Sequence, residues 1–332
     1  ASSATTIGVE AQPKTDDFQL LSSKKVTLSG HIEGYEYLQG LNSSVGFFFG
    51  TSQSLQESGK KIYSTLKNDG SFSYDLSEFE EGTTYYFSAF LCVNDEYTYG
   101  DVQSFDSPKV PDSEEIQEAL SYSGYEALHI NEDGSVYSDQ SGLTLDLGAV
   151  GKGIAADEVI ELLEAKNADR SDGSTVDGAV VSIGGTILTY GSKKGNQTWQ
   201  VGIRNPRGRI DSMLGFLNLE GTHVISTSGD YEQYFETNGI RYHHIFDPKT
   251  GYPADQGLMS VTIVCESGLA SDGLSTACFV LGYEESLPLL EKYQAEAVFV
   301  TLDRKIYVTD GLYDCLQITD DSYTLMTEEF ER

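Results

Sequence analysis

The chain has 332 residues, 39% of them apolar, and a net charge of −31 from 21 basic and 52 acidic side chains. This charge repels the phosphates of nucleic acid and of anionic lipid, so neither is expected as a partner. The length suits about two or three domains, and no apolar run approaches the roughly 18 residues that a membrane-spanning helix needs.

The first residues, Ala-Ser-Ser-Ala-Thr-Thr, are typical of a tail left after a leader has been removed. We therefore expect an exported protein, on a bacterial cell surface or elsewhere outside the cytoplasm, with a lipid anchor on residues ahead of Ala1. Four cysteines, at positions 92, 265, 278 and 315, form no C-x-x-C pair and no zinc spacing. We expect them to be small buried apolar residues.

Residues 1–18 are polar and without pattern, which predicts a flexible segment. Residues 19–107 contain short alternating or apolar runs, at 26–32, 45–49, 82–90 and 99–105, with a turn at 68–71. Short strands at regular turn spacing favour a β-sandwich. The runs Gly82-Thr-Thr-Tyr-Tyr-Phe87 and Tyr99-Gly-Asp-Val-Gln-Ser-Phe105 resemble a fibronectin type III or related immunoglobulin-like module.

Residues 108–112 include Pro108-Lys-Val-Pro111 and are predicted to be a linker. From 113 to 332 the pattern becomes mixed helix and strand. One helical stripe is expected from Ala155, Val159, Leu162 and Leu163, and another from Leu274, Ala277, Cys278 and Leu281. Strands are expected at 179–183, 261–264, 297–300 and 306–308.

The segment Ser271-Asp-Gly-Leu-Ser-Thr-Ala277 places Asp272 and Thr276 four residues apart, on one face at the start of the second helix. A carboxylate and a hydroxyl are hard oxygen donors that suit Mg²⁺, and the unpaired N–H groups of a helix start favour anions. The alternative is that Asp272 is only the N-cap of its helix and Thr276 bonds its own backbone.

The segment Asp146-Leu-Gly-Ala-Val-Gly-Lys-Gly153 combines three glycines with a lysine. Glycines allow the backbone to approach a ligand closely, and Lys152 supplies a point charge for phosphate. The segment is neither a Walker A motif nor the G-x-G-x-x-G of a dinucleotide fold.

Three more blocks lie between these two: Ser182-Ile-Gly-Gly185, Ser226-Thr-Ser-Gly-Asp-Tyr231 and Tyr242-His-His-Ile-Phe-Asp-Pro-Lys-Thr-Gly-Tyr-Pro253. The five blocks, in this order, resemble the FAD:protein FMN transferases of the ApbE family over about residues 111–332. The resemblance implies an α+β ApbE-like flavin transferase domain, preceded by the all-β immunoglobulin-like sandwich. Family members have about a hundred further residues before this region, so the domain at 113–332 is expected to be N-terminally incomplete.

The resemblance also implies a site. The metal ligands would be the carbonyl of Ala149, Asp272 and Thr276, and the catalytic residues would be His244, Asp272 and Lys152. The cofactor-binding residues would be Gly148, Lys152, Gly184, Gly185, Thr227, Ser228, Gly229 and His244. Thr186 stands where the family usually has asparagine, which replaces an amide by a hydroxyl. His243 is expected to be structural.

The implied reaction attaches FMN from FAD, held through Mg²⁺, to a Thr or Ser hydroxyl of an exported acceptor protein and releases AMP. Two other interpretations remain open. One is a pyrophosphatase that hydrolyses FAD to FMN and AMP, and the other is a non-catalytic flavin-binding surface or adhesion protein. A second chain that completes the FAD site is a further expected partner.

Overall fold

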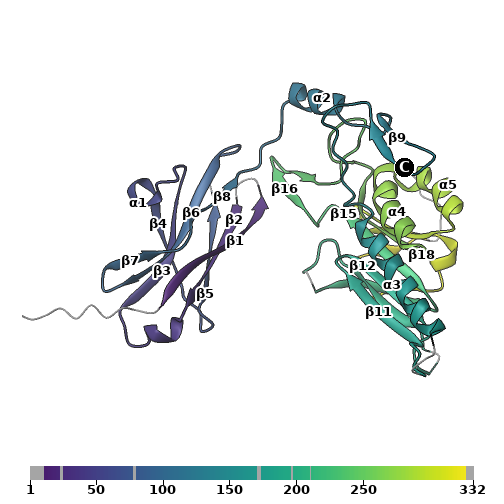
Figure 1. The fold of residues 1–332 in the computed structure, drawn as a ribbon, viewed down its shortest axis with the longest axis horizontal. Coiled ribbons are helices and arrows are strands. Elements are labelled where there is room, and N and C mark those ends of the chain that lie inside the picture. The colour runs from purple at the N-terminus through teal and green to yellow at the C-terminus, as the bar shows by residue number, and fades with distance from the viewer. Residues whose placement is uncertain are drawn as a thin grey trace, which may run out of the picture. The chain divides into compact units, whose positions relative to one another are not determined.

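The computed structural model describes residues 11–22, 25–77, 80–169, 173–195, 197–209 and 211–326. The chain divides into two compact units (Figure 1). The first comprises residues up to Asp112 together with Tyr234–Tyr242, and the second comprises Ser113–Gln233 and the residues from His243 onward. The short segment at 234–242 thus groups with the first unit, although the predicted second domain ran without interruption from residue 113.

The first unit is a sandwich of two antiparallel sheets. One sheet has the order β1 (Gln12–Ser22), β2 (Lys25–Glu33), β5 (Ser71–Ser77), and the other has the order β4 (Lys60–Ser64), β3 (Ser43–Gly50), β6 (Thr84–Val93), β7 (Glu96–Tyr99), with β8 (Gln103–Asp106) also paired to β6. Short helices η1 (Tyr35–Leu38) and α1 (Leu55–Ser58) join the strands.

The core of the sandwich is aromatic. Phe47 of one sheet meets Phe72 of the other with ring centroids 5.2 Å apart, and Phe87 is fully buried beside them. Residues of β2 alternate between buried and half-exposed, as expected when one face of a strand meets the core. The predicted all-β sandwich is therefore confirmed.

The predicted flexible segment 1–18 is wrong where the structure describes it, because β1 begins at Gln12. β1 pairs antiparallel with β2 along most of its length. β1 is the edge strand of its sheet. Its side chains carried no apolar pattern because Gln12, Lys14, Asp17 and Gln19 are exposed. Phe18 packs against the core from this strand. Residues 1–10 lie outside the described ranges.

The second unit is built on a seven-stranded sheet. Its order is β11 (Gly178–Ile183), β12 (Thr186–Gly191), β15 (His223–Gly229), β18 (Leu258–Cys265), β19 (Glu296–Thr301), β20 (Lys305–Val308), β22 (Thr324–Leu325). Neighbours are antiparallel except β20 and β22. The strands predicted at 179–183, 261–264, 297–300 and 306–308 are all present within this sheet.

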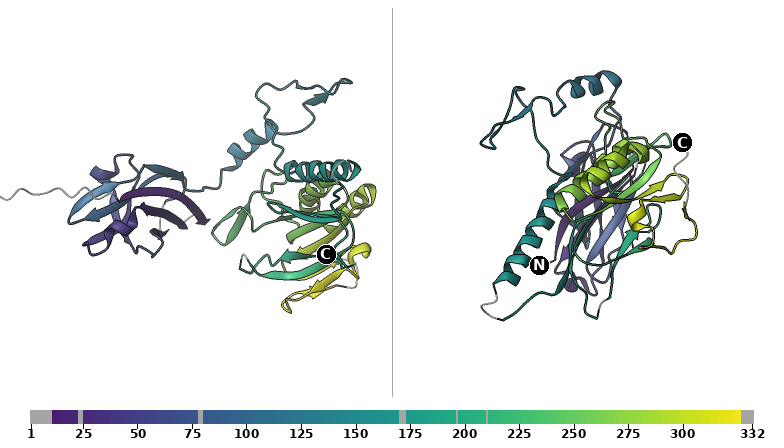
Figure 2. Two further views of the ribbon diagram at one scale, coloured as in Figure 1. Left: turned by 60° about the horizontal axis from the view of Figure 1, so that its bottom comes forward. Right: turned by 90° about the vertical axis from the view of Figure 1, so that its right-hand side faces the viewer.

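Helices α3 (Gly151–Ala168), α4 (Gly268–Leu281) and α5 (Tyr283–Tyr293) cover one face of this sheet (Figure 2). A three-stranded sheet of β13 (Trp199–Arg204), β14 (Met213–Leu219) and β21 (Leu316–Ile318) covers the other. β18 is buried along its whole length because both of its faces are covered. Val261 and Ile263 pack toward α4, whereas Met259 and Val264 pack with the three-stranded sheet.

The remaining elements are short. They are α2 (Ser113–Ser121), β9 (Leu128–Ile130), β10 (Val136–Ser138), β16 (Tyr234–Thr237), β17 (Ile240–His243) and η2 (Asp310–Leu312). β9 pairs with β10, and β16 with β17.

The two predicted helical stripes differ in outcome. In α4, Leu274 and Cys278 are buried as predicted. In α3, the stripe is displaced: Gly153 and Ala156 are buried, whereas Leu162 is 68% exposed. Val159 of the predicted stripe and its neighbour Ile160 still pack against the core residues Ala156, Leu188 and Val224, so the predicted apolar face is confirmed only in part.

All four cysteines are free thiols. Cys92, Cys265 and Cys278 are buried, as predicted, and Cys315 is half-buried. Burial raises the pKa of the Cys278 thiol. Among the described residues, no helix has the length and apolarity needed to cross a membrane.

Candidate functional site

A tight turn leads into α3. The Asp146 carboxylate accepts a hydrogen bond from the backbone N–H of Gly148 at 2.7 Å. The N–H groups of Val150 and Gly151 both donate to the carbonyl of Leu147, at 3.0 and 2.8 Å. Ala149 lies exposed at the tip of this turn. Asparagine and aspartate commonly close such turns by bonding the backbone two residues on, so the local sequence explains this conformation.

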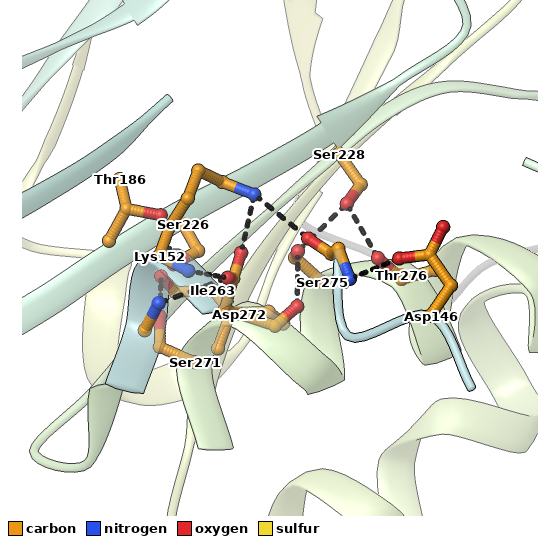
Figure 3. Close-up of polar contacts among 12 residues, drawn as sticks. Asp146, Lys152, Thr186, Ser226, Ser228, Ile263, Ser271, Asp272, Ser275 and Thr276 are labelled. Carbon is orange, nitrogen blue, oxygen red and sulfur yellow. Dashed lines mark hydrogen bonds and ion pairs between the residues drawn. The ribbon is translucent and has the colours of Figure 1, made fainter. Parts of the chain in front are cut away.

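The N-terminus of α3 is capped by a residue of α4. Val150, at the N-cap position of α3, supplies no side-chain cap. The N–H groups of Lys152 and Gly153 instead donate to Asp272 Oδ2, at 3.1 and 3.0 Å, across 120 and 119 positions of sequence (Figure 3). The Asp272 side chain is only 4% exposed. A buried carboxylate needs such donors, because an unpaired charge would be strongly destabilising there.

The alternative role for Asp272, as the N-cap of its own helix, is wrong. Ser267 is the N-cap of α4, and its Oγ accepts from the N–H of Ala270 at 3.2 Å. Asp272 lies one turn further along. The N–H groups at the start of α4 are also not open to an anion, because Asp157 of α3 accepts from Gly268 and Leu269.

Lys152 connects the turn to Asp272. Its Nζ lies 3.2 Å from Asp272 Oδ1 and 3.4 Å from the carbonyl oxygen of Gly148. The stem of Lys152 passes Gly184, where a Cβ would lie 3.3 Å from Lys152 Cδ. Gly184 has φ 58°, in the left-handed region that favours glycine. The Gly-Gly turn between β11 and β12 therefore lies beside Lys152.

A cluster of hydroxyls extends the site from Asp272 along α4. Ser228 Oγ, at the end of β15, lies 2.8 Å from Ser275 Oγ and 3.2 Å from Thr276 Oγ1. Ser275 Oγ in turn donates to the backbone carbonyl of Asp272 at 2.8 Å (Figure 3). The structure therefore connects Ser228, Thr276 and Asp272 through hydrogen bonds.

Two hydroxyls of the neighbouring strands are used internally. Successive residues of a strand point to opposite faces, and Thr227 Oγ1 bonds Thr262 Oγ1 at 2.8 Å on the face away from Ser228. Thr186, at the family's usual asparagine position, is fully buried and bonds Ser226 Oγ at 3.1 Å. The Thr227 backbone lies near Gly185, whose Cβ would lie 3.9 Å from the Thr227 carbonyl oxygen.

The three residues after Ser228 are Gly229, Asp230 and Tyr231, and two arginines contact the second and third of them. A Cβ on Gly229 would lie 2.9 Å from Cδ1 of Tyr231, so a side chain at this position would require the Tyr231 ring to move. Asp230, nearly buried, receives two hydrogen bonds from Arg207 at 2.7 and 2.6 Å. The Arg204 guanidinium lies 4.9 Å from the centre of the Tyr231 ring. Burial raises the pKa of Tyr231 to about 12.

The two adjacent histidines have different environments. His243 is buried, lies edge-on to Phe279 with ring centres 5.4 Å apart, and has Nε2 3.2 Å from the Ala254 carbonyl. This is the structural role that the sequence predicted for it. His244 is exposed, and its Nδ1 lies 3.2 Å from the carbonyl oxygen of Gln233. A ring nitrogen facing a carbonyl must carry a proton, so the Nε2 of neutral His244 is an acceptor.

The sequence model of the ApbE family matches residues 96–299 of this chain. The chain belongs to the ApbE family. The match starts in β7, ahead of the start near residue 111 that the motifs suggested.

Relatives of this ApbE family member include two proteins named FAD:protein FMN transferase. The one from Treponema pallidum is 36% identical over 236 residues, which is 67% of this chain and 63% of the relative. One from Klebsiella pneumoniae is 34% identical over 62% of this chain and 61% of the relative. The chain therefore spans a little under two thirds of the length of these relatives.

Solved ApbE structures have the same fold as the matched region. The ApbE protein of Thermotoga maritima is similar with a TM-score of 0.56 and 31% identity, over 65% of this chain and 66% of that one. The apo flavinyl transferase ApbE of Pseudomonas stutzeri is similar with a TM-score of 0.52 and 32% identity, over 63% and 62%. These likenesses confirm the predicted α+β ApbE-like domain.

The donor atoms of this ApbE site suit the divalent cation that the family implies. Asp272 Oδ2 is occupied by two N–H groups, but Oδ1 faces only a positive group, the Lys152 ammonium, among its identified contacts. Thr276 adds a hydroxyl, and Ala149, the third residue that the family implies, is exposed in the turn before α3. No group of three or more His, Cys, Asp or Glu able to hold a metal occurs in the described part of the chain. A single carboxylate combined with neutral oxygen donors suits Mg²⁺ better than a metal ion that prefers sulfur ligands.

The sequence patterns missed two residues of this site. Ser275 belongs to the segment 271–277, whose motif points only to Asp272 and Thr276. Asp157 lay outside every block. A signal for Asp157 does exist, because Gly153-Ile-Ala-Ala-Asp157 and Gly268-Leu-Ala-Ser-Asp272 share the spacing Gly-x-x-x-Asp. In a helix this spacing puts glycine and aspartate on the same face.

Proposed function

We propose that this ApbE family member is a Mg²⁺-dependent FAD:protein FMN transferase. In this reaction it attaches FMN through a phosphoester to a Thr or Ser hydroxyl of an exported acceptor protein and releases AMP. The observation that carries the proposal is the hydrogen bonding of Asp272 to Lys152 and Gly153, which brings two distant motifs into one site with Thr276 and Ser228. The names of the relatives support the reaction class.

Electrostatics assign the roles around the pyrophosphate. Asp272 Oδ1, the Thr276 hydroxyl and the Ala149 carbonyl would hold Mg²⁺, which would neutralise charge on the pyrophosphate of FAD. Lys152, whose side chain is 39% exposed, supplies a second positive charge beside Asp272. In a chain of net charge −31 this local positive charge is needed to admit an anionic ligand.

The transfer step needs a proton acceptor. The acceptor hydroxyl oxygen forms a bond to the FMN phosphorus, the bond to the AMP oxygen breaks, and AMP leaves with the electron pair. His244 Nε2, free to accept because Nδ1 faces the Gln233 carbonyl, would take the hydroxyl proton. Positioning and charge neutralisation supply most of the rate enhancement in such phosphoryl transfers.

The test is to mix the full chain, FAD and Mg²⁺ with an acceptor protein that FAD:protein FMN transferases modify. We expect the acceptor to gain the mass of one FMN phosphoester, with one AMP released for each acceptor modified. An acceptor with its target Thr replaced by Val is the matched control and should gain nothing. Asp272→Asn in the chain should abolish both products.

Other outcomes decide between the remaining interpretations. AMP release without any acceptor, lost in Asp272→Asn, would replace the proposal by FAD hydrolysis. Mg²⁺-dependent FAD binding with neither AMP release nor an adduct would replace it by a flavin-binding protein without catalysis. Activity that appears only after a second polypeptide is added would show that another chain completes the site.

A further inference from the structure

The helices α3 and α4 cap each other. At the start of α4, Gly268 N–H donates to Asp157 Oδ1 at 2.5 Å and Leu269 N–H donates to Asp157 Oδ2 at 2.8 Å. At the start of α3, Lys152 and Gly153 donate to Asp272 Oδ2. Each helix therefore begins on a carboxylate of the other helix.

The two contacts are related by the same short pattern. Asp157 lies four residues after Gly153 in α3, and Asp272 lies four residues after Gly268 in α4. The glycines let the backbones approach: a Cβ on Gly153 would overlap the carbonyl of Gly268 and lie 2.8 Å from Asp272 Cβ. A Cβ on Gly268 would likewise lie 3.0 Å from the carbonyl carbon of Gly153 and from Asp157 Oδ1.

This arrangement determines where Asp272 lies. Asp157 bonds only backbone N–H groups of α4 among its identified contacts, so it acts on the site through the helix that carries Asp272 and Thr276. The first N–H groups of a helix have no partner within the helix, so a nearby negative charge stabilises them. Removing the Asp157 carboxylate would leave these groups of α4 without their acceptor. The start of α4 would then be free to shift relative to α3.

We propose that Asp157 is a positioning residue for the cation and pyrophosphate site of Asp272, a role that rests on the proposed function. It touches neither the reacting atoms nor the ligands named above. Some residues hold a metal ligand in position without binding the metal themselves. Replacing such a residue typically lowers metal affinity by about 10–100-fold. We expect Asp157→Ala to weaken divalent binding by about 10-fold or more, and Asp157→Asn, which keeps one acceptor oxygen, to weaken it less.

The experiment measures Mn²⁺ binding to the full chain by electron paramagnetic resonance without FAD, and then FAD binding as a function of Mg²⁺ by flavin fluorescence. The matched control is Ser267→Ala. It removes the side-chain cap of the same helix, the bond from Ala270, but leaves the Asp157 contacts intact. Thermal unfolding of each variant shows how much stability it has lost.

We expect Asp157→Ala to raise both the Mn²⁺ concentration for half-maximal Mn²⁺ binding and the Mg²⁺ concentration for half-maximal FAD binding; these two concentrations are the midpoints. Asp157→Asn should raise them less. Ser267→Ala should leave both midpoints unchanged, although it lowers the melting temperature. The proposal would be overturned if Ser267→Ala and Asp157→Asn raised the midpoints equally while losing the same stability. Asp157 would then only stabilise the helix. Unchanged midpoints in a folded Asp157→Ala variant would also overturn it.

The outcome separates this proposal from the proposed function. If the unmodified chain transfers no FMN but its Mn²⁺ midpoint still moves in Asp157→Ala and not in Ser267→Ala, the positioning role stands and the transferase assignment fails. If the unmodified chain binds no Mn²⁺, both are overturned.

Discussion

Gly153 and Gly268 are in backbone contact where α3 meets α4, and neither position has room for a Cβ. This contact brings the turn before α3 against the second turn of α4. The Asp272 carboxylate can bond Lys152 and Gly153 only because the two helices approach so closely. The geometry of the site therefore depends on two residues that have no side chain.

Replacing Gly153 by Ala should separate the helices. The added methyl group would overlap the Gly268 carbonyl, and overpacking of this kind costs about 1–3 kcal/mol or more. Urea unfolding followed by the fluorescence of Trp199 measures the loss, because this single tryptophan lies in β13 of the second unit. Gly151→Ala is the matched control.

At Gly151 a Cβ meets nothing within 4 Å and φ is not positive, so alanine there should be neutral or stabilise the chain by about 0.4–1 kcal/mol. Equal stability of the Gly153→Ala and Gly151→Ala variants would contradict the close approach of the two helices.

Asp272→Asn should separate the two roles of this side chain. The amide oxygen can still accept from Lys152 and Gly153, so the start of α3 should persist, but the charge facing a cation is lost. We expect Mg²⁺-dependent FAD binding to weaken by at least about 10-fold. Isothermal titration checks this, with the exposed Asp211→Asn as a control of equal charge change. Similar affinities in both variants would show that Asp272 does not bind the cation.

Thr276 offers a test with two conservative variants. Thr276→Val keeps the shape but removes the hydroxyl, whereas Thr276→Ser keeps the hydroxyl. Ser228 would retain its bond to Ser275 in both variants, so the fold should be preserved. We expect the Mg²⁺ concentration for half-maximal FAD binding to rise about 10-fold or more in Thr276→Val and to change little in Thr276→Ser. If Thr276→Val and Thr276→Ser needed the same Mg²⁺ concentration for half-maximal FAD binding, Thr276 would not be a metal ligand.

His244→Gln should lower the rate of FMN transfer far more than it weakens FAD binding. Loss of a general base typically costs about 10²–10⁴-fold in rate. Single-turnover kinetics with the acceptor protein separates the chemical step from binding. His223→Gln is a suitable control, because His223 also bonds a backbone carbonyl, that of Glu220 at 2.8 Å. A rate unchanged in His244→Gln would exclude His244 as the proton acceptor.

Tyr231 should make the second unit sensitive to alkaline pH. Its pKa rises from 10.0 to about 12 on burial, so between these values the unfolded state binds fewer protons than the folded state. Stability is unaffected below pH 10 and falls as pH rises toward 12, by about 1.4 kcal/mol per unit at most. Tyr231→Phe should remove this part of the slope in Trp199-monitored unfolding, whereas Tyr125→Phe, at a position 81% exposed, should not. The same slope in both variants would contradict the burial of Tyr231.

The linear sequence determined much of this protein. Alternating strands such as 26–32 were predictable because one face of a sandwich strand meets the core and the other meets water. The stripe Leu274 and Cys278 identified α4 for the same kind of reason. The motif blocks pointed to Lys152, Asp272 and Thr276 through their joint resemblance to the ApbE family, because each segment alone also fits a structural role.

Only the tertiary structure decided how these residues act. The sequence indicated Asp272 as a metal ligand or as the N-cap of its own helix, but the fold also uses it to cap α3, where it accepts from the N–H of Lys152, 120 residues earlier. It also decided that Thr227 points away from Ser228 and that Asp157 supports α4. Local propensity reports the conformation of a segment and which face is apolar. It carries no information on which distant backbone N–H groups will meet a carboxylate, because that depends on how closely two helices can pack.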